Sequence, residues 1–378
     1  MGKAGPASAG SRGAIGEPPH HFRSLLTTGE HAMVIHALTA DQILAIPAIE
    51  PERLFTGDPA AARAEYRKLA SIWHPDHNPD ARAAAVFDHI AGLYRRAESR
   101  LAGGTWLVPG LLKLTAVNGQ AYEIRYRKRR PFELGEMFIG RGVVAYVLTG
   151  EYTDLWRAAT STVDGFRFAN PAMQAEVARY LPSPAGAFET RDASVLVIKK
   201  AAKHVLLADL LEHVGGTLAP EHMAWILSSL LNVACYLRYA GLTHNAISLD
   251  TYFVAPSDHS GALLGGWWYA AARGAKLRAL PAQSLRLLPP DMLGAKRADP
   301  RLDLDLIRGV GRALLGDESG ASLGRDGRVP APLRHWLRLA SSGDAVQEYD
   351  YWQRHVLTES FGARRFVPLH VSADAIYS

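Results

Sequence analysis

The sequence predicts an α+β protein of several domains, in which a helical module, a β-hairpin, a mixed lobe and a helical lobe follow one another. Two segments between positions 61 and 101 repeat apolar residues at helical spacing. Asn118-Gly119 separates two runs in which apolar and polar residues alternate, which is the strongest short-range hairpin signal. Short strands after Pro131 precede a mainly helical region, and 378 residues is long for a single core.

The composition excludes several classes of protein. The 42 lysines and arginines against 37 aspartates and glutamates give a net charge of +5, too small an excess to indicate nucleic-acid binding by itself. Cys235 is the single cysteine, so an internal disulfide and a Cys-rich zinc site are excluded, and we expect a cytoplasmic protein without metal or cofactor. The longest charge-free apolar segment, 223–237, falls short of the roughly 20 residues of a membrane helix, and no signal peptide is expected.

The chain divides into five predicted regions. They are a flexible leader at 1–40, a helical module at 41–104, a basic β-hairpin connector at 105–130, a mixed lobe at 131–202, and a helical lobe with a tail at 203–378. The leader is rich in Gly, Ala, Ser and Pro and has no periodicity. In the mixed lobe we expect strands at about 132–150 and 194–199, with a helix at about 171–181 between them.

Two amphipathic helices form the core of the helical module. Apolar residues of the first lie at i, i+3 and i+7, and the opposite face is predicted to be wet and basic. That basic face carries Arg63, Arg67 and Lys68. The second helix keeps its apolar stripe until Gly103-Gly104 ends it, whereas Pro47 and Pro51 predict that any helix before the first is short or irregular.

The triplet His74-Pro75-Asp76 lies between the two helices. Pro75 disfavours helical geometry at His74, which ends the first helix and leaves Asp76 exposed beside the cations. A carboxylate next to several cations suits a partner that offers both an arginine and an acidic patch. The alternative is a polar loop whose proline and aspartates only form the turn.

The sequence around this triplet, with Tyr66-Arg67-Lys68-Leu69-Ala70 before it and Phe87, Ile90 and Leu93-Tyr94 after it, resembles the J domain of DnaJ-type co-chaperones over about residues 50–101. The resemblance implies docking on a DnaK-type chaperone and stimulation of its ATP hydrolysis. It implies that the docking residues are His74, Pro75, Asp76 and Asn78, together with the cations Arg63, Arg67 and Lys68. His77 stands where the family commonly has an arginine or a lysine.

From about 131 to 345 the order of elements resembles the two-lobed protein-kinase fold. The resemblance places a glycine loop at Gly140 and Gly142, a helix with its glutamate at Glu176, and a long apolar helix at about 221–239. A catalytic-loop segment beginning at His244 and a metal loop at Gly265-Gly266 follow. The glycine string by itself is weak evidence, since a β-hairpin turn explains it equally well.

The residues that phosphoryl transfer requires are replaced in this region. Ala246 stands for the catalytic aspartate, Ser248 for its lysine neighbour, Thr251 for the metal-binding asparagine and Gly266 for the metal-binding aspartate. No lysine occurs from Phe132 to Ile198. The resemblance therefore implies a pseudokinase, which is not an enzyme and serves as a platform for a protein client, with His244 as a buried core residue. The alternative is an atypical kinase or nucleotide-binding switch rebuilt from Asp250, Glu176 and Arg157.

Two further features carry weaker predictions. Five cations surround Tyr126, namely Arg125, Arg127, Lys128, Arg129 and Arg130. Alternating Arg and Tyr on a strand suits phosphate contacts and base stacking, so a nucleic-acid adaptor is a further alternative, and a solvated edge strand protected by charge is the other interpretation. Trp267-Trp268-Tyr269 is predicted to fill the core or the cleft that a missing nucleotide leaves, with a peptide groove as the alternative.

Overall fold

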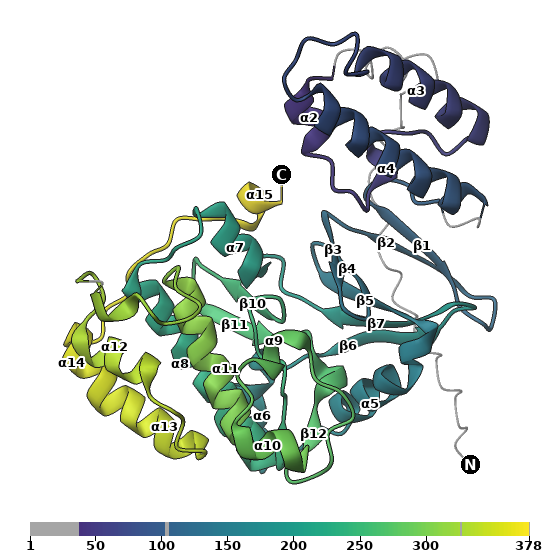
Figure 1. The fold of residues 1–378 in the computed structure, drawn as a ribbon. Helices are drawn as coiled ribbons and strands as arrows, with labels where there is room; N and C mark the ends of the chain where they lie inside the picture. The colour runs from purple at the N-terminus through teal and green to yellow at the C-terminus, as the bar shows by residue number, and fades with distance from the viewer. Residues whose placement is uncertain (1–37, 103–105, 326, 378) are drawn as a thin grey trace, which may run out of the picture. The chain divides into compact units, whose positions relative to one another are not determined.

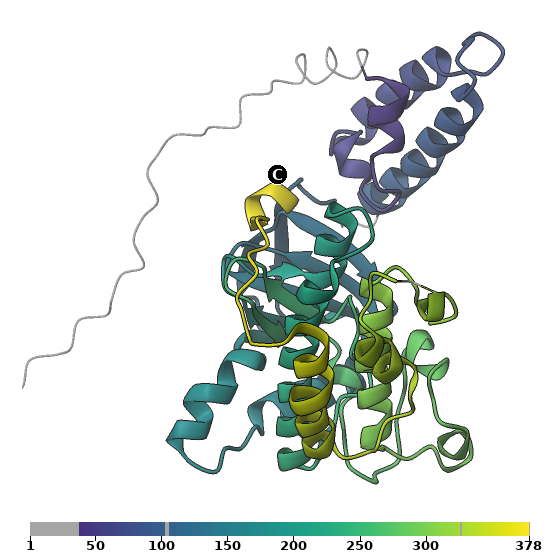
Figure 2. The same ribbon diagram turned by 90° about the vertical axis from the view of Figure 1, so that its left-hand side faces the viewer.

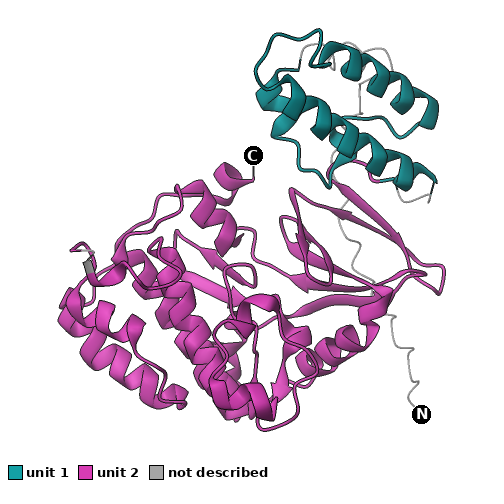
Figure 3. Cartoon of the chain, viewed as in Figure 1, with its two compact units in different colours: residues 1–106 teal, residues 107–378 magenta. Residues whose placement is uncertain are grey.

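The computed structural model describes residues 38–102, 106–325 and 327–377, so the predicted leader up to position 37 and Gly103-Gly104 lie outside the described residues. The chain forms two compact units, Met1–Trp106 and Leu107–Ser378, which Figure 3 shows in different colours. We call them the N-terminal unit and the body. Helices and sheets are mixed along the chain, as the sequence predicts.

The N-terminal unit is built on two packed helices, α3 (Pro59–Ile72) and α4 (Ala83–Ala102), which confirm the two predicted amphipathic helices. Before them lie α2 (Ala40–Leu44), which ends ahead of Pro47, and a single 3₁₀ turn at Pro51–Arg53, so the expectation of a short, irregular first segment is also confirmed. The Asp58 carboxylate caps α3 by accepting the Ala61 N–H at 2.8 Å.

A single apolar core holds this unit together. The helices α2, α3 and α4 and the two residues after the 3₁₀ turn contribute fully buried side chains: Ile43, Leu54, Phe55, Ala62, Leu69, Val86, Ile90, Leu93 and Ala97. Tyr66 of α3 stacks on Tyr94 of α4 at 4.2 Å between ring centroids. The apolar stripes of the sequence thus face one another, which leaves the opposite face of α3 to solvent.

The body begins with the predicted hairpin, formed by β1 (Leu111–Thr115) and β2 (Ala121–Arg125). Gly119 lies in the turn with φ +84°, a conformation that glycine tolerates best. One face of the hairpin packs on a five-stranded antiparallel sheet, where Tyr122 stacks on Phe188 at 4.0 Å.

The five-stranded sheet has the order β3-β4-β5-β7-β6 (Figure 1). Its strands are β3 (Lys128–Phe132), β4 (Gly135–Ile139), β5 (Val143–Thr149), β6 (Pro184–Glu189) and β7 (Ala193–Lys199). Alternate residues of β5 face opposite sides, because Ala145 joins the core under the hairpin whereas Val144, Tyr146 and Leu148 join the main core of the body.

One helix of this lobe was not predicted. The helix α5 (Thr153–Asp164) follows β5 and packs on β7 through Trp156, Ala159 and Val163, and the Trp156 indole N–H donates to the Val195 carbonyl at 3.0 Å. The predicted helix at 171–181 is present but shorter, as α6 (Pro171–Val177) and a 3₁₀ turn. The predicted boundary at 130/131 falls inside β3, so the end of the basic segment, Lys128 to Arg130, belongs to the five-stranded sheet.

The helical lobe is centred on α8 (Pro220–Ala240), which confirms the predicted apolar helix and packs on α11 (Pro300–Leu314). The remaining helices are α7 (Leu207–His213), α9 (Ala282–Leu285), α10 (Pro290–Ala295), α12 (Ala331–Arg338), α13 (Ala345–Tyr351), α14 (Thr358–Phe361) and α15 (Ala373–Ile376). Small sheets join β8 (Val205–Leu206), β10 (Tyr252–Ala255) and β11 (Ser260–Leu263), and β9 (Leu242–Thr243) and β12 (Ala271–Ala272).

The C-terminal segment runs back along the body from α14 to α15, which lies beside α7 (Figure 2). Among the helices that the structure describes, none combines the length and the apolar composition needed to cross a membrane.

Candidate functional site

The loop between α3 and α4 is held in place by its own backbone and by Asn78. The N–H groups of His77 and Asn78 both donate to the His74 carbonyl, at 3.0 and 2.9 Å. The Asn78 side-chain amide donates to the Ile72 carbonyl at 2.9 Å, which satisfies a free carbonyl at the end of α3. Asn78, predicted as a docking residue, therefore also sets the shape of the loop.

The triplet itself faces solvent. The Asp76 side chain is 77% exposed and lies 3.7 Å from Nδ1 of His74, whose ring packs edge-to-face on Phe87 at 5.5 Å. Pro75 is exposed as well. Since the Asp76 backbone N–H donates to His74 Nδ1 at 3.2 Å, the histidine orients the residue that carries the exposed carboxylate.

The three predicted cations of α3 are exposed, as the helical spacing requires. Arg63 and Arg67 are one helical turn apart and Lys68 is next to Arg67, whereas Ala62, Glu65 and Leu69 face the core. Buried Glu65 accepts the Thr56 N–H at 2.9 Å. The N-terminal unit thus presents an exposed carboxylate on the loop and exposed cations on the preceding helix.

In the body, four residues of the predicted degenerate catalytic region meet at one point. A Cβ atom added to Gly266 would lie 2.7 Å from Cε1 of His244, 3.0 Å from Cγ2 of Thr251 and 3.2 Å from Cβ of Ala246. Gly266 also has φ +81°, in the left-handed region. The structure therefore brings together His244, Ala246, Thr251 and Gly266 and leaves no room among them for a larger side chain at Gly266.

This crowding gives a testable prediction. Replacing Gly266 with alanine should lower the free energy of unfolding by about 2–4 kcal/mol, because the left-handed backbone and the overlap with His244 both carry a cost. Gly142→Ala is the matched control, since no heavy atom lies within 4 Å of its added Cβ, and its effect should stay below about 0.5 kcal/mol. Chemical denaturation measures both variants, and equal losses would contradict the prediction.

His244 is a buried core residue, as predicted. Its Nε2 lies 2.9 Å from the Gly265 carbonyl and its Nδ1 accepts the Ala246 N–H at 3.3 Å, so the ring is neutral with the proton on Nε2. Burial lowers the pKa of His244 to about 3. A histidine in this state orders the loop and is not poised to accept a proton.

Asp303 is the residue that the sequence interpretation missed. It lies in the first turn of α11, fully buried, and its carboxylate accepts the backbone N–H groups of His244 at 2.7 Å and Asn245 at 2.6 Å. Asn245 adopts φ +65°, which asparagine tolerates. Asp303 thus fixes the segment that contains Ala246, although 58 residues separate it from Asn245.

Asp303 should also make stability depend on pH. Burial raises the pKa of Asp303 to about 7 from 3.8, so between these values the native state holds a proton that the unfolded chain has released. The contribution of Asp303 to the free energy of unfolding therefore falls as pH rises from about 4 to about 7, by at most about 1.4 kcal/mol per pH unit. The difference in unfolding free energy between the wild type and Asp303→Asn, measured across this range, should show that slope; a constant difference would contradict it.

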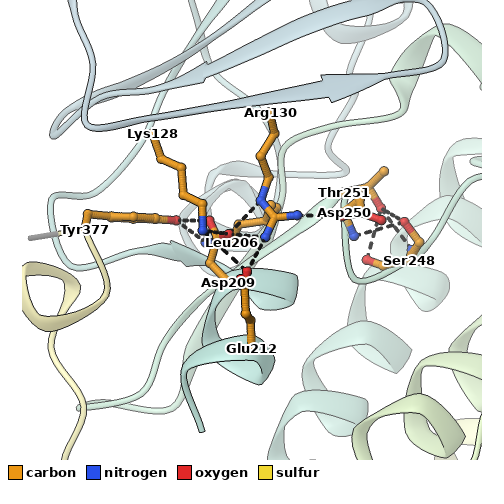
Figure 4. Close-up of polar contacts among 9 residues, drawn as sticks. All are labelled: Lys128, Arg130, Leu206, Asp209, Glu212, Ser248, Asp250, Thr251 and Tyr377. Atoms are coloured by element: carbon orange, nitrogen blue, oxygen red, sulfur yellow. Dashed lines mark hydrogen bonds and ion pairs between the residues drawn. The ribbon is translucent and has the colours of Figure 1, made fainter. Parts of the chain in front are cut away.

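The polar groups that follow Ala246 bond to one another. The Thr251 hydroxyl donates to the Ala246 carbonyl at 2.9 Å. It also accepts the Ser248 N–H at 2.9 Å, and Ser248 Oγ accepts the Asp250 N–H at 3.2 Å (Figure 4). Thr251 and Ser248 therefore close the loop. A metal ion would have to compete with these hydrogen bonds.

Aromatic side chains fill the space between the sheet and the segment after Gly266. Trp267, Trp268 and Tyr269 form a buried 3₁₀ turn that α5 packs against, which confirms that they fill a core. Trp268 stacks on Phe132 and meets Tyr146 edge-on, both at 5.1 Å between centroids. We call Phe132, Tyr146 and Trp268 the aromatic plug.

The lysine nearest to the glycine turn has a structural role. Buried Lys200 follows β7, and its Nζ donates to three carbonyls, those of Arg141 at 3.1 Å, Ala201 at 3.1 Å and His204 at 2.8 Å. Burial lowers the pKa of Lys200 to about 8. With these three hydrogen bonds made, its ammonium group holds the turn that contains Gly140 and Gly142.

Three predicted kinase-like positions lie apart from the residues around Gly266. Gly140 and Gly142 lie in the turn of the β4–β5 hairpin, as the hairpin interpretation predicts, and a Cβ at Gly140 would come within 2.7 Å of the Arg125 carbonyl. Glu176 is exposed on α6, whereas the helix that packs on the Trp267 turn is α5, which contains no glutamate. The structure thus leaves Glu176 on an exposed face of α6, and the unpredicted α5 lies against the Trp267 turn instead.

The basic segment is not a single strand, which corrects the prediction for Arg125 to Arg130. Arg125 ends β2, whereas Lys128 begins the edge strand β3 in another sheet. The chain changes sheets between them, so their side chains do not alternate along one surface.

Most of these cations are neutralised within the body. Buried Arg129 pairs with Glu136, and Arg127 pairs with Asp374 at 2.5 Å. Lys128 and Arg130 pair with Asp209 at 2.8 and 2.5 Å (Figure 4). Four of the five cations therefore have a carboxylate partner within the body, and the fifth, Arg125, is exposed at the end of β2.

Asp209 joins three elements of the body. Its fully buried carboxylate receives the cations of β3 and also accepts the Tyr377 hydroxyl at 2.8 Å, while the Tyr377 oxygen accepts the Leu206 N–H at 2.8 Å (Figure 4). Burial beside the Asp209 carboxylate raises the pKa of Tyr377, which stays protonated. The sheet, α7 and the C-terminal segment are therefore tied at one carboxylate.

The chain was compared with protein families, with curated sequences and with solved structures. No family model matches the chain, and no curated protein matches it in sequence. The structure of vaccinia related kinase 3 is similar, with 12% sequence identity over 66% of this chain and 90% of that chain, and a TM-score of 0.47. Within the described residues no group of three or more His, Cys, Asp or Glu side chains is arranged to hold a metal ion.

Proposed function

We propose that this protein is a J-domain co-chaperone that docks on a DnaK-type chaperone and stimulates its ATP hydrolysis. The observation that carries the proposal is the loop between α3 and α4, where His74-Pro75-Asp76 is exposed next to a helix with an exposed cationic face. Such a surface pairs with a partner that offers an arginine for Asp76 and acidic residues for Arg67 and Lys68.

Adding the purified full-length chain to a DnaK-type chaperone tests this function. Single-turnover ATP hydrolysis should accelerate with the concentration of the chain and saturate when docking is complete. The same rate at every concentration would overturn the proposal.

We further propose that the body is a degenerate protein-kinase-like domain that holds a protein client and transfers no phosphate. Ala246 and Gly266 offer no ligand for a metal ion, Thr251 is hydrogen-bonded within the loop, and the aromatic plug occupies the space beside Gly266. The ammonium group of Lys200 is bound to backbone carbonyls. A client held by the body would be concentrated near the chaperone, because one chain links the two binding sites.

The nucleotide-switch alternative makes the opposite prediction. A ligand that binds the native state must stabilise it, by about 2.7 kcal/mol at a concentration of 100 times its dissociation constant. We expect no dose-dependent rise in melting temperature with ATP and Mg²⁺, because the aromatic plug fills the space between the sheet and the segment after Gly266. A clear rise followed by phosphate transfer would establish an atypical kinase instead.

A further inference from the structure

An exposed cationic surface lies on the body in the segment 273–301, between β12 and the start of α11 (Figure 1). Seven lysines and arginines against two aspartates give this segment a net charge of +5, as large as that of the whole chain. The cations are Arg273, Lys276, Arg278, Arg286, Lys296, Arg297 and Arg301. A charge concentrated in this way attracts an anionic partner over a distance of about a Debye length.

Both aspartates of the segment form ion pairs with the same arginine. Arg301 pairs with Asp291 at 2.6 Å and with Asp299 at 2.8 Å. The other six cations are exposed, and in the part of the chain that the structure describes none of the six forms an ion pair with a carboxylate. They differ in this respect from Lys128 and Arg130, which Asp209 neutralises.

The backbone brings the two ends of the segment together. Lys276 pairs with Arg297 in an antiparallel bridge, the Leu277 N–H donates to the Lys296 carbonyl at 2.9 Å, and the Ala298 N–H donates to the Ala275 carbonyl at 2.8 Å. Arg273 and Arg297 line a hollow beside α10, together with Arg301 and the two aspartates that it pairs with. We call Arg273, Lys276, Arg278, Lys296 and Arg297 the basic patch.

Two features identify the chemistry of the partner. The segment contains no aromatic residue on which a nucleic-acid base could stack, and it exposes two leucines, Leu285 at 51% and Leu293 at 55%. Lys296 caps the C-terminus of α10 with φ +47°, in the left-handed region. Glycine would be less strained in this backbone conformation, but the sequence has a lysine there. Exposed cations and exposed leucines within one segment suit a chain with carboxylates and apolar side chains of its own.

We propose that the basic patch, with Leu285 and Leu293 nearby in sequence, binds acidic peptide segments that also carry apolar side chains. This inference rests on the proposed function, since it names the chemical class of client that the body would hold. It places client binding on a part of the body that is separate in sequence from the His244–Gly266 region.

Fluorescence anisotropy with a labelled synthetic peptide of interspersed glutamate, leucine and serine tests the proposal on the full chain. The variant Lys276→Glu/Arg278→Glu/Lys296→Glu leaves Arg297 in place, because Arg297 donates to the Gly274 carbonyl at 2.8 Å. The matched control, Arg191→Glu/Arg364→Glu/Arg365→Glu, makes the same charge change at exposed positions elsewhere on the body. Substituting glutamine at the three patch positions provides a second variant if charge reversal disturbs folding.

The patch variants should weaken peptide binding about tenfold or more, the control should stay within about twofold, and added salt should weaken wild-type binding. A peptide with glutamine in place of glutamate should bind poorly. Equal binding by wild type and patch variants would overturn the proposal, and so would tighter binding of a single-stranded or duplex DNA oligonucleotide than of the peptide. Stimulation of the chaperone ATPase, measured on the same variants, should not change. The two measurements therefore distinguish failure of the peptide-binding proposal from failure of the proposed co-chaperone function.

Discussion

Exchanging Asp76 for asparagine should reduce the stimulation of a DnaK-type chaperone's ATP hydrolysis to the basal rate, without changing the free energy of unfolding. The Asp76 side chain is 77% exposed, and the hydrogen bond to His74 Nδ1 comes from the backbone N–H, which asparagine retains. The variant therefore keeps the loop and removes only the negative charge. A charge-assisted bond to an arginine of the partner is lost, and the arginine is left without a counter-ion.

Asp88→Asn is the matched control, because it removes the same charge from an exposed position on α4 outside the loop. It should stimulate like the wild type. His74→Gln should behave like Asp76→Asn, since glutamine cannot reproduce the ring that packs on Phe87 and accepts the Asp76 N–H. Full stimulation by either loop variant would show that the exposed triplet is only a turn.

The N-terminal unit could be predicted closely because its determinants are local. The stripe of Ala62 and Leu69 on α3 and of Ile90 and Leu93 on α4 fixes which faces pack, and Pro47 shortens the segment before them. Asn118-Gly119 similarly specifies the β1–β2 hairpin. Each of these features is encoded within a few residues of the element that it determines.

The body could be predicted only in part because its decisive contacts are distant in sequence. α5 buries Trp156, Ala159 and Val163, a stripe containing only two large apolar side chains, and it was missed. Without α5, α6 was the one helix expected in this lobe, and Glu176 was therefore assigned to a helix that the structure shows as short and exposed. The charges of Lys128 and Arg130 suggested a nucleic-acid surface, because nothing near them in sequence indicates that Asp209 lies against them.

Replacing Asp303 with alanine should cause the largest loss of stability, about 3–5 kcal/mol in the free energy of unfolding of the body. The backbone N–H groups of His244 and Asn245 would both be left buried without an acceptor, since Asp303 is 3% exposed and water has no access. The free energy of unfolding of a typical domain is only about 5–15 kcal/mol, so the expected loss is a large fraction of it. Chemical denaturation with a probe in the body, such as its tryptophans, measures it.

Two further variants separate the lost hydrogen bonds from the lost charge. Asp303→Asn keeps one acceptor oxygen, so one of the two N–H groups stays paired and the loss should be clearly smaller than for alanine. Asp350→Ala removes a carboxylate that is 53% exposed and should cost no more than about 1 kcal/mol. If Asp303→Ala were as stable as Asp350→Ala, Asp303 would not be the residue that holds the His244 segment. If it is as damaging as expected, the two backbone N–H groups that Asp303 accepts are what fixes the segment containing Ala246, across 58 residues of sequence.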